Sequence, residues 1–331
     1  MNDEAILKML GSKIQNGLQS LIDDDFSWLD VPFHKNIGDS LIACGTAAFL
    51  KALPSRLLYK ASNIFFNDSY LPHRGIILMH GGGNFGDLWP SHHRFRTGII
   101  AQRTRQRIVV LPQTVWYQDK KNLQADKEIY GRHPDLTICA RDAGSFHFLQ
   151  EHFPRNRILL MPDMAFCLNL EEYRRNSLSG RDLYLCRTDK EIGTHEDAER
   201  NFIRDDQQHG QLEVRDWPGV VPREGAWQQL QETAAHYQTR LARRMIGWNM
   251  RGLWVSDSFG LKGSRFSEQQ MRIGIRMFLQ YDRIYTNRLH GMILALLLAK
   301  PVVCFDNSYG KNSAFFNTWL RELDGCRFVY P

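Results

Sequence analysis

Apolar positions recur at two different spacings along this chain, and they predict a succession of helices and strands. At residues 4–22 the apolar residues share one face of a helix, and they are Ile6, Leu10, Ile14, Leu18 and Leu21. This face predicts a helix that packs against the rest of the protein. Because such a face also suits a helix lying on a membrane surface, that alternative stays open.

Short apolar runs after residue 27 predict strands. In the first half of the chain they cover 28–31, 56–60, 76–80, 108–111, 136–140 and 158–161. Helical patterns follow several of them, for example at 38–50 and 143–152. Strand–helix alternation of this kind is typical of a parallel sheet with helices on both faces.

A polar stretch at 168–181 predicts a linker, after which a second series of elements begins. Its predicted strands cover 182–187, 253–256, 283–286 and 302–305, and its predicted helices cover 225–246, 267–280, 291–299 and 314–323. We therefore expect an α/β protein with two Rossmann-like domains, at 1–170 and 182–310, whose parallel sheets face a central cleft. A helix within 311–331 is expected to cross back. Such sheets bind ligands at the carboxyl ends of their strands.

The composition supports a folded protein and excludes several classes. With 331 residues, 43% of them apolar and 24% charged, the chain is neither disordered nor collagen-like nor a coiled coil. The net charge of +6 suits an anionic ligand, a membrane surface or nucleic acid, but no run of five Lys or Arg occurs, which argues against nucleic acid. The longest apolar run, 292–299, is too short to cross a membrane, and the six cysteines form no CxxC pair. We expect buried free thiols in a cytoplasmic protein that at most touches the inner membrane.

The strongest local signal is the segment 80–87, where a predicted strand runs into three successive glycines. Glycine permits a positive φ and a close approach of the backbone to a ligand, and the helix expected to follow would offer free N–H groups to an anion. The spacing of Gly81, Gly83 and Gly86 satisfies Gly-x-Gly-x-x-Gly, but no acidic residue stands at the tip of the next strand, and the lysine of a Walker loop is missing. A tight turn that serves packing alone is the alternative.

The pattern Asn-x-Gly-Asp occurs twice, at 36–39 and 84–87. Each copy is predicted to follow a strand and open a helix, so that two helix N-termini share one rim of a sheet. Asn or Asp in this position caps a helix, and a ligand contact is an equally open interpretation.

Charged residues are predicted at the ends of several strands. Arg141 and Arg187 each end a strand, and Arg288 and His290 follow the strand 283–286. Arginine binds carboxylate and phosphate groups in a bidentate manner, and histidine is suited to proton transfer near neutral pH. Together they indicate a small ligand with two anionic groups. Asp163 also ends a strand, where it is predicted to cap the next helix.

These motifs, in this order, resemble those of the polysaccharide pyruvyl transferase family. The matching segments are Asn36-x-Gly38-Asp39, His80-Gly81-Gly82-Gly83-Asn84-x-Gly86-Asp87, Leu111-Pro112-Gln113, Arg141-Asp142 with Ser145, Pro162-Asp163-x-Ala165 and Thr286-x-Arg288-x-His290-Gly291. The resemblance implies a GT-B-like fold and a transfer of pyruvate from phosphoenolpyruvate (PEP) to two hydroxyls of a sugar. The product is a cyclic ketal on a bacterial exopolysaccharide or its lipid-linked precursor, and phosphate is released. The stretch 188–250 matches nothing in the family.

The resemblance also implies roles for individual residues. His290 is the expected general acid, and Asp39 or Asp87 is expected to take a hydroxyl proton. The expected substrate-binding residues are Arg187, Arg288, Leu289, Gly82, Gly83, Asn84, Asn36, Arg141, His80 and Trp116. The N-terminal domain is the expected acceptor side and the C-terminal domain the expected PEP side. Trp89, Trp116 and Tyr117 stack on sugar faces or pack in the core. This route needs no cofactor and no metal.

Two other functions fit part of the sequence. A sugar-nucleotide-dependent glycosyltransferase of the same fold would also use a helix N-terminus and an arginine for phosphate. It would need a glutamate for the ribose, and none is evident after Gly291. A sugar-binding protein without catalysis is the second possibility, against which Arg288 and His290 argue.

Overall fold

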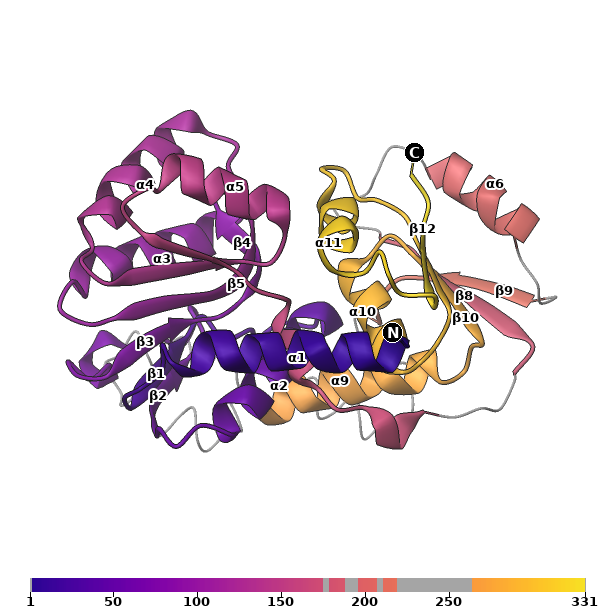
Figure 1. The fold of residues 1–331 in the computed structure, drawn as a ribbon, viewed down its shortest axis with the longest axis horizontal. Coiled ribbons are helices and arrows are strands. Elements are labelled where there is room, and N and C mark those ends of the chain that lie inside the picture. The colour runs from indigo at the N-terminus through magenta and orange to yellow at the C-terminus, as the bar shows by residue number, and fades with distance from the viewer. Residues whose placement is uncertain (1, 175–178, 188–195, 207–210, 219–263, 331) are drawn as a thin grey trace.

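A computed structural model describes residues 2–174, 179–187, 196–206, 211–218 and 264–330. It consists of two parallel sheets that lie side by side, each with helices on its faces (Figure 1). The predicted helix at 225–246 and the predicted strand at 253–256 lie outside the described residues. The α/β class and the parallel sheets are confirmed.

The first sheet takes up the first half of the chain. Its strands are β1 Phe26–Leu29, β2 Leu57–Ala61, β3 Ile76–Met79, β4 Gly82–Gly86, β5 Ile108–Trp116, β6 Leu136–Ala140 and β7 Arg157–Leu160. Their order is β2-β1-β3-β5-β6-β7, and β4 pairs with β5 beyond the end of β3. The helices of this half are α1 Asp3–Gln19, α2 Ile37–Lys51, α3 Pro90–Gln102, α4 Lys120–Arg132 and α5 Ala143–His152. Short 3₁₀ turns occur at Asp68–Tyr70, Met164–Cys167 and Glu171–Tyr173.

The second sheet is smaller and has the order β12-β11-β10-β8-β9 within the described residues. Its strands are β8 Arg181–Leu185, β9 Gln211–Arg215, β10 Arg283–Thr286, β11 Val302–Cys304 and β12 Cys326–Phe328. Its helices are α6 Glu196–Asp206, α9 Ser264–Phe278, α10 Leu289–Leu297 and α11 Lys311–Trp319. Helix α10 is apolar almost all round, which fits its burial beneath the sheet.

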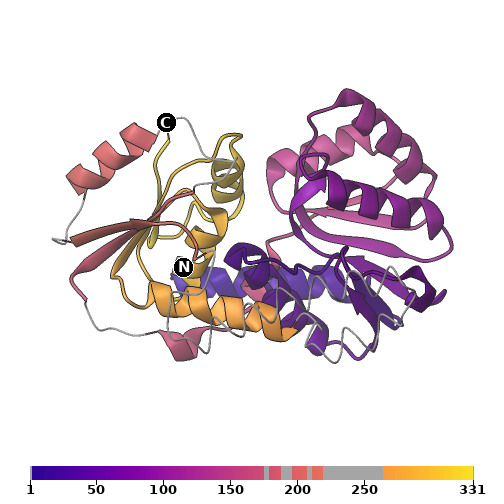
Figure 2. The ribbon, with the colours of Figure 1, turned by 180° about the vertical axis from the view of Figure 1, so that it is seen from behind.

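The helix α1 runs along the boundary between the two sheets (Figures 1 and 2). Its apolar face is buried, with Ile14 and Leu18 wholly inaccessible to solvent. At its first turn, the Asp3 carboxylate accepts hydrogen bonds from the backbone N–H groups of Asp324 and Gly325, at 3.0 and 2.7 Å. Because the protein itself covers the apolar face, the alternative of a membrane-lying helix is wrong for α1.

One hydrophobic core reaches across both sheets. It joins buried residues of β1, β3, β5 and β6 to buried residues of β8, β10 and β11. Helix α2 of the first half packs on α9 of the second, where a side chain at Gly274 would meet Ile37 at 2.7 Å. Helix α11 reaches the first half, where Trp319 Nε1 donates to the backbone oxygen of Arg141 at 2.7 Å. The two halves are therefore fixed against each other by packing.

The six cysteines are unpaired, as the sequence predicts, and Cys167 is half-buried while the others are buried. Burial raises the pKa of the Cys44 and Cys139 thiols to about 12, so these groups are protonated at neutral pH. Within the described part of the chain, no helix combines the length and the apolar composition that crossing a membrane requires.

Candidate active site

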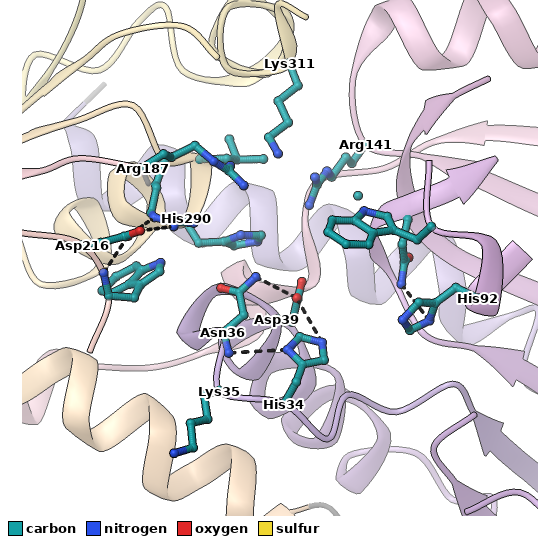
Figure 3. Close-up of a pocket in the computed structure, with 16 residues that line it drawn as sticks. His34, Lys35, Asn36, Asp39, His92, Arg141, Arg187, Asp216, His290 and Lys311 are labelled. Atoms are coloured by element: carbon teal, nitrogen blue, oxygen red, sulfur yellow. Dashed lines mark hydrogen bonds and ion pairs between the residues drawn. The ribbon is translucent and has the colours of Figure 1, made fainter. Parts of the chain in front are cut away.

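A cavity of about 650 Å³ lies where the carboxyl ends of both sheets meet (Figure 3). The first half lines it with His34, Lys35, Asn36, Asp39, Gly83, Asn84, Trp89, His92 and Arg141. The second half adds Arg187, Asp216, Trp217, Arg288, Leu289, His290 and Lys311. Nine of the residues expected to be catalytic or substrate-binding line this cavity, and they are Asn36, Asp39, Gly83, Asn84, Arg141, Arg187, Arg288, Leu289 and His290.

The glycine segment forms a strand, and the helix start predicted to follow it directly is wrong. After the kink at His80 and Gly81 the chain resumes as β4, which pairs with the far end of the nine-residue strand β5. Helix α3 begins only at Pro90 and has no side-chain cap. Asn84 therefore lies in a strand, and the second Asn-x-Gly-Asp copy does not cap a helix. Backbone pairing with β5 outweighs the capping signal of the sequence.

Two glycines of this strand have backbone conformations that favour glycine. Gly82 has φ +134°, and Gly86 has φ +99°. At Gly83 glycine is favoured by lack of space, because a Cβ atom there would lie 3.1 Å from Nη2 of Arg141. The strand can thus pass directly beside the guanidinium group at the cavity wall.

The substitution Gly86→Ala is expected to destabilise the protein by about 2 kcal/mol or more. A Cβ atom would lie 1.9 Å from the backbone oxygen of Trp116, in a φ region that costs roughly 1–3 kcal/mol for other residues. Chemical denaturation measures the change. Gly98→Ala is the matched control, since nothing lies within 4 Å of its Cβ position and alanine favours the helix α3 by about 0.5–1 kcal/mol. Equal stabilities of the two variants would contradict the expectation.

Asp87 does not line the cavity, so the proposed catalytic role for it is withdrawn. Its carboxylate accepts hydrogen bonds from the backbone N–H groups of Gln118 and Asp119, at 2.6 and 2.8 Å, and from Asn122 Nδ2 at 3.0 Å. These bonds hold the pKa of Asp87 below its usual range, against the effect of burial. Asp87 fixes the loop between β5 and α4.

His80 and Trp116 also fall outside the cavity. His80 is buried under the sheet edge, its ring 5.8 Å from that of Trp28, and burial lowers its pKa to about 3. It is therefore a neutral core residue at physiological pH and lacks access to a ligand. Trp116 is half-exposed and packs on Tyr309, with ring centroids 4.8 Å apart. Gly82 does not line the cavity either.

The N-terminus of α2 forms the floor of the cavity. Asn36 caps this helix by accepting from the Gly38 N–H at 3.0 Å, and its Nδ2 donates to Asp39 at 2.8 Å. Burial works against ionisation of Asp39, but the charges of His34 and His290 outweigh it and hold the pKa of Asp39 below its usual range. Asp39 is therefore an anion at neutral pH and a weak base.

His290 lies on the first turn of α10, against α2. Its Nε2 is buried 3.4 Å from Asp163 Oδ2. A Cβ atom at Gly38 would lie 2.7 Å from Nδ1, so the glycine keeps the space beside this nitrogen clear. The ring therefore packs closely on α2 through its Nδ1 edge, while His290 lines the cavity.

Asp163 joins His290 to a second buried cation. Arg141 Nη1 donates to its Oδ2 at 2.8 Å, and both side chains are almost wholly inaccessible to solvent. Burial opposes ionisation of Asp163, yet His290 and Arg141 hold its pKa far below its usual range. Asp163 also caps the following 3₁₀ turn through the Ala165 N–H, as the sequence predicts. Its contact with His290 was not predicted.

Cations from the second half line the opposite wall (Figure 3). Arg187 follows β8, and its backbone N–H donates to Asn287 Oδ1 at 2.8 Å, which fixes the main chain at this point. Arg288 precedes α10 and donates from Nε and Nη2 to the two oxygens of Asp216, at 2.5 and 2.6 Å. Lys311 reaches the same space from the first turn of α11.

The electrostatics of the cavity favour an anion. Four cationic side chains line it besides Lys35, and only Asp39 and Asp216 contribute negative charge among the lining residues that the structure describes. The N-termini of α2, α10 and α11 also open here, and helix N-termini attract anions. Within the described ranges no group of three or more His, Cys, Asp or Glu side chains is arranged to hold a metal ion.

The sequence analysis missed several lining residues. Lys311 and Asp216 carry no motif, and Asp216 meets Arg288 only through the fold, 72 residues away in sequence. His92 pairs with the buried Asp30, 62 residues earlier. Trp89 lines the cavity, whereas Tyr117 packs in the core and donates to Asp126 at 2.7 Å.

The sequence is similar to known proteins along nearly its whole length. Residues 36–309 match the polysaccharide pyruvyl transferase family. The chain is 31% identical to the "Putative pyruvyl transferase EpsO" of Bacillus subtilis, over 96% of this chain and 93% of that protein. It is 29% identical to "Pyruvyl transferase 1" of Schizosaccharomyces pombe, over 90% and 71%. A crystal structure of an uncharacterised Klebsiella pneumoniae protein shares the fold, with TM-score 0.63 at 19% identity over 97% of this chain and 98% of that one.

Proposed function

The chain belongs to the polysaccharide pyruvyl transferase family, and we propose that it transfers the pyruvyl group of PEP to two hydroxyls of a saccharide. The product is a cyclic ketal, and inorganic phosphate is released. The observation that carries the proposal is a cavity in which several cations surround a histidine that lies beside a buried aspartate. We also propose that the two halves form a GT-B-like arrangement, with the acceptor bound mainly by the first half and PEP by the second.

The cationic wall suits PEP, which carries a phosphate and a carboxylate. Arg187, Arg288 and Lys311 line one side of the cavity, and the first turn of α10 lies between them. Arginine binds both anionic groups through paired N–H donors, and each such bond is stronger than a neutral one. Asp216 holds the Arg288 guanidinium in one orientation, which prepares it for a planar anion. Arg141, fixed by Asp163, adds positive charge from the facing wall.

His290 is suited to start the reaction as a general acid. The protonated imidazole gives a proton to the methylene carbon of PEP, and the electron pair of the double bond forms the new C–H bond. The neighbouring carbon becomes an oxocarbenium-like centre, and a saccharide hydroxyl attacks it. Phosphate then leaves with its bonding pair, and the second hydroxyl closes the ring. Of the two hydroxyl protons, one replaces the proton that His290 supplied and the other leaves with phosphate.

The other wall suits a saccharide. Asn36, Asn84 and His92 supply hydrogen-bonding groups there, and Trp89 offers a half-exposed aromatic face. Sugars are bound by such combinations of amide, imidazole and aromatic side chains, because their hydroxyls need polar partners and their C–H faces pack on rings. We propose that the acceptor belongs to a bacterial exopolysaccharide or its lipid-linked precursor, and that the reaction takes place in the cytoplasm.

The experiment is to incubate the protein with PEP and candidate saccharides, both free and lipid-linked. Release of inorganic phosphate together with the mass gain of a pyruvate ketal would support the proposal. Release of a nucleotide from a sugar nucleotide would favour a glycosyltransferase instead, a function that the family match does not favour. Binding of saccharide without turnover of either donor would indicate a binding protein.

The substitution Arg187→Ala is expected to weaken PEP binding about tenfold or more. A hydrogen bond to a charged group contributes roughly 1.5–3 kcal/mol, and 1.4 kcal/mol corresponds to about a factor of ten. Calorimetric titration with PEP measures the change. Arg132→Ala is the control, because this arginine lies on the surface end of α4 with three quarters of its side chain exposed. Unchanged affinity in the Arg187 variant would remove it from the PEP site.

A further inference from the structure

A second histidine–aspartate pair faces the same cavity from the first half of the chain. His92, on the first turn of α3, lies with Nδ1 2.7 Å from Oδ1 of Asp30 (Figure 3 shows His92 on the wall opposite Arg187 and His290). Asp30 is buried at the end of β1 and has φ +61°, a backbone conformation that is uncommon outside glycine. Its position is thus specified by the surrounding structure.

Asp30 is held as an anion by a second buried contact. Arg96, one helical turn after His92, donates to Asp30 Oδ2 from Nε and lies with Nη2 also 2.8 Å from that oxygen. Arg96 and His92 outweigh the effect of burial and hold the pKa of Asp30 below its usual range. Arg96 Nη2 also donates to Asn84 Oδ1 at 2.8 Å, which turns the amide nitrogen of Asn84 toward His92. One buried pair therefore positions two residues of the cavity wall.

The contact with Asp30 decides which ring nitrogen of His92 carries the hydrogen. Nδ1 of His92 lies 2.7 Å from the Asp30 carboxylate and 3.3 Å from the amide nitrogen Nδ2 of Asn84. An ionised carboxylate only accepts hydrogen bonds, and its contact is the shorter of the two, so we assign the hydrogen to Nδ1. In the neutral ring Nε2 then has the free electron pair. Among the described residues nothing forms a hydrogen bond with Nε2, and His92 lines the cavity together with Asn84 and Trp89. A basic nitrogen is thus presented to the side of the cavity that suits a saccharide.

We propose that His92 is the general base that takes the proton of the attacking saccharide hydroxyl, and that Asp30 positions it. This rests on the proposed function. In the step, the hydroxyl oxygen bonds to the carbon that bears the phosphate, and its proton moves to Nε2 of His92. The protonated ring then gives this proton to the departing phosphate, whose bond to carbon breaks with both electrons on oxygen. The second hydroxyl loses its proton to the now neutral His290, so both histidines return to their starting states.

Asp39 is the other candidate for this proton, and its surroundings suit it less. Its carboxylate already accepts from Asn36 Nδ2 and lies 3.4 Å from His34 Nε2. These contacts stabilise the ionised form, which makes the group a poor proton acceptor. Nε2 of His92, by contrast, makes no hydrogen bond with a described residue. The two histidines would divide the chemistry, with His290 as acid at the cationic wall and His92 as base at the other.

The test compares His92→Gln with wild type in steady-state release of phosphate from PEP and a saccharide acceptor. We expect turnover to fall about a hundred- to ten-thousandfold, with PEP affinity by calorimetry unchanged. The rise of turnover with pH that reports deprotonation of the base is expected to vanish. Asp30→Asn is expected to lower turnover in the same direction while the affinity for PEP stays unchanged. His93→Gln is the matched control. His93 neighbours His92 on α3 but pairs with Asp126 of α4 outside the cavity, so this variant is expected to keep its turnover.

The outcomes separate the roles. A His92→Gln variant with near-normal turnover and a raised acceptor KM would make His92 a binding residue and overturn the proposal. An unchanged pH profile would overturn it as well. If the proposed function itself is wrong, the result is different: the wild-type protein releases no phosphate from PEP with any saccharide. That outcome would overturn both proposals.

Discussion

His290→Ala is expected to bind PEP almost as tightly as wild type and to lose about a hundred- to ten-thousandfold in turnover. General acid catalysis contributes a factor of this size, and the proton transfer occurs mainly in the transition state. Nε2 of His290 makes no hydrogen bond within the described residues and lies 3.4 Å from Asp163 Oδ2, so we expect the alanine variant to stay folded. Phosphate release gives the turnover, and calorimetry gives the affinity for PEP.

His290→Gln separates proton donation from anchoring. Glutamine keeps a hydrogen-bond donor but cannot protonate carbon, so this variant is expected to be nearly as slow as the alanine variant. A glutamine variant that keeps most of its activity, or an alanine variant that fails to bind PEP, would show that His290 anchors phosphate. The acid would then have to be another group, and His80 is excluded because it is buried and neutral.

Asp163→Ala is expected to destabilise the protein by about 3–5 kcal/mol. Removal of one partner from a buried ion pair leaves the other charge without compensation, and here Arg141 would be left almost wholly buried. The free energy of unfolding from denaturant titration measures the effect. The double variant Asp163→Leu with Arg141→Met is the control, since it removes both charges and is expected to lose less.

The pH dependence of this pair has a definite sign. The folded-state pKa of Asp163 lies far below its usual range, so the stabilisation is complete above the unfolded value of about 3.9 and is lost as the pH falls. The difference in stability between wild type and Asp163→Asn is therefore expected to be constant between about pH 5 and 8 and to shrink below about pH 4. A difference that grows on acidification would contradict the assignment of Asp163 as an anion.

Much of the fold could be predicted from local pattern alone. The predicted strand at 136–140 and the helix at 143–152 agree with β6 and α5, because strand–helix alternation with short loops determines such elements locally. The glycine segment was predicted wrongly because its structure depends on β5, more than 20 residues later. Capping residues indicate that a helix could begin at a position. They carry no information about whether a distant strand is available to pair with the same segment. Asp87 was misassigned for the same reason, since its partners lie in the loop after β5.

The site residues that directly follow a strand could be predicted from the sequence. Arg141, Arg187, Arg288 and His290 all line the cavity, as the rule for parallel sheets predicts. The residues that orient them were not predictable. Asp163 meets His290 across 127 positions of sequence, and a pairing at such a distance leaves no spacing that a single sequence could reveal.

The hydrophobic core that spans both sheets, and that α1 and α11 help to close, also affects how the protein unfolds. Buried residues of both sheets belong to one hydrophobic cluster, so neither sheet can lose its packing while the other keeps all of its own. The two halves therefore share part of their folding free energy, and a destabilising substitution in one half is expected to lower the stability of the other. Three strand ends carry Arg141, Arg187, and Arg288 with His290. We expect them to hold their spacing while the whole molecule stays folded and to lose it together.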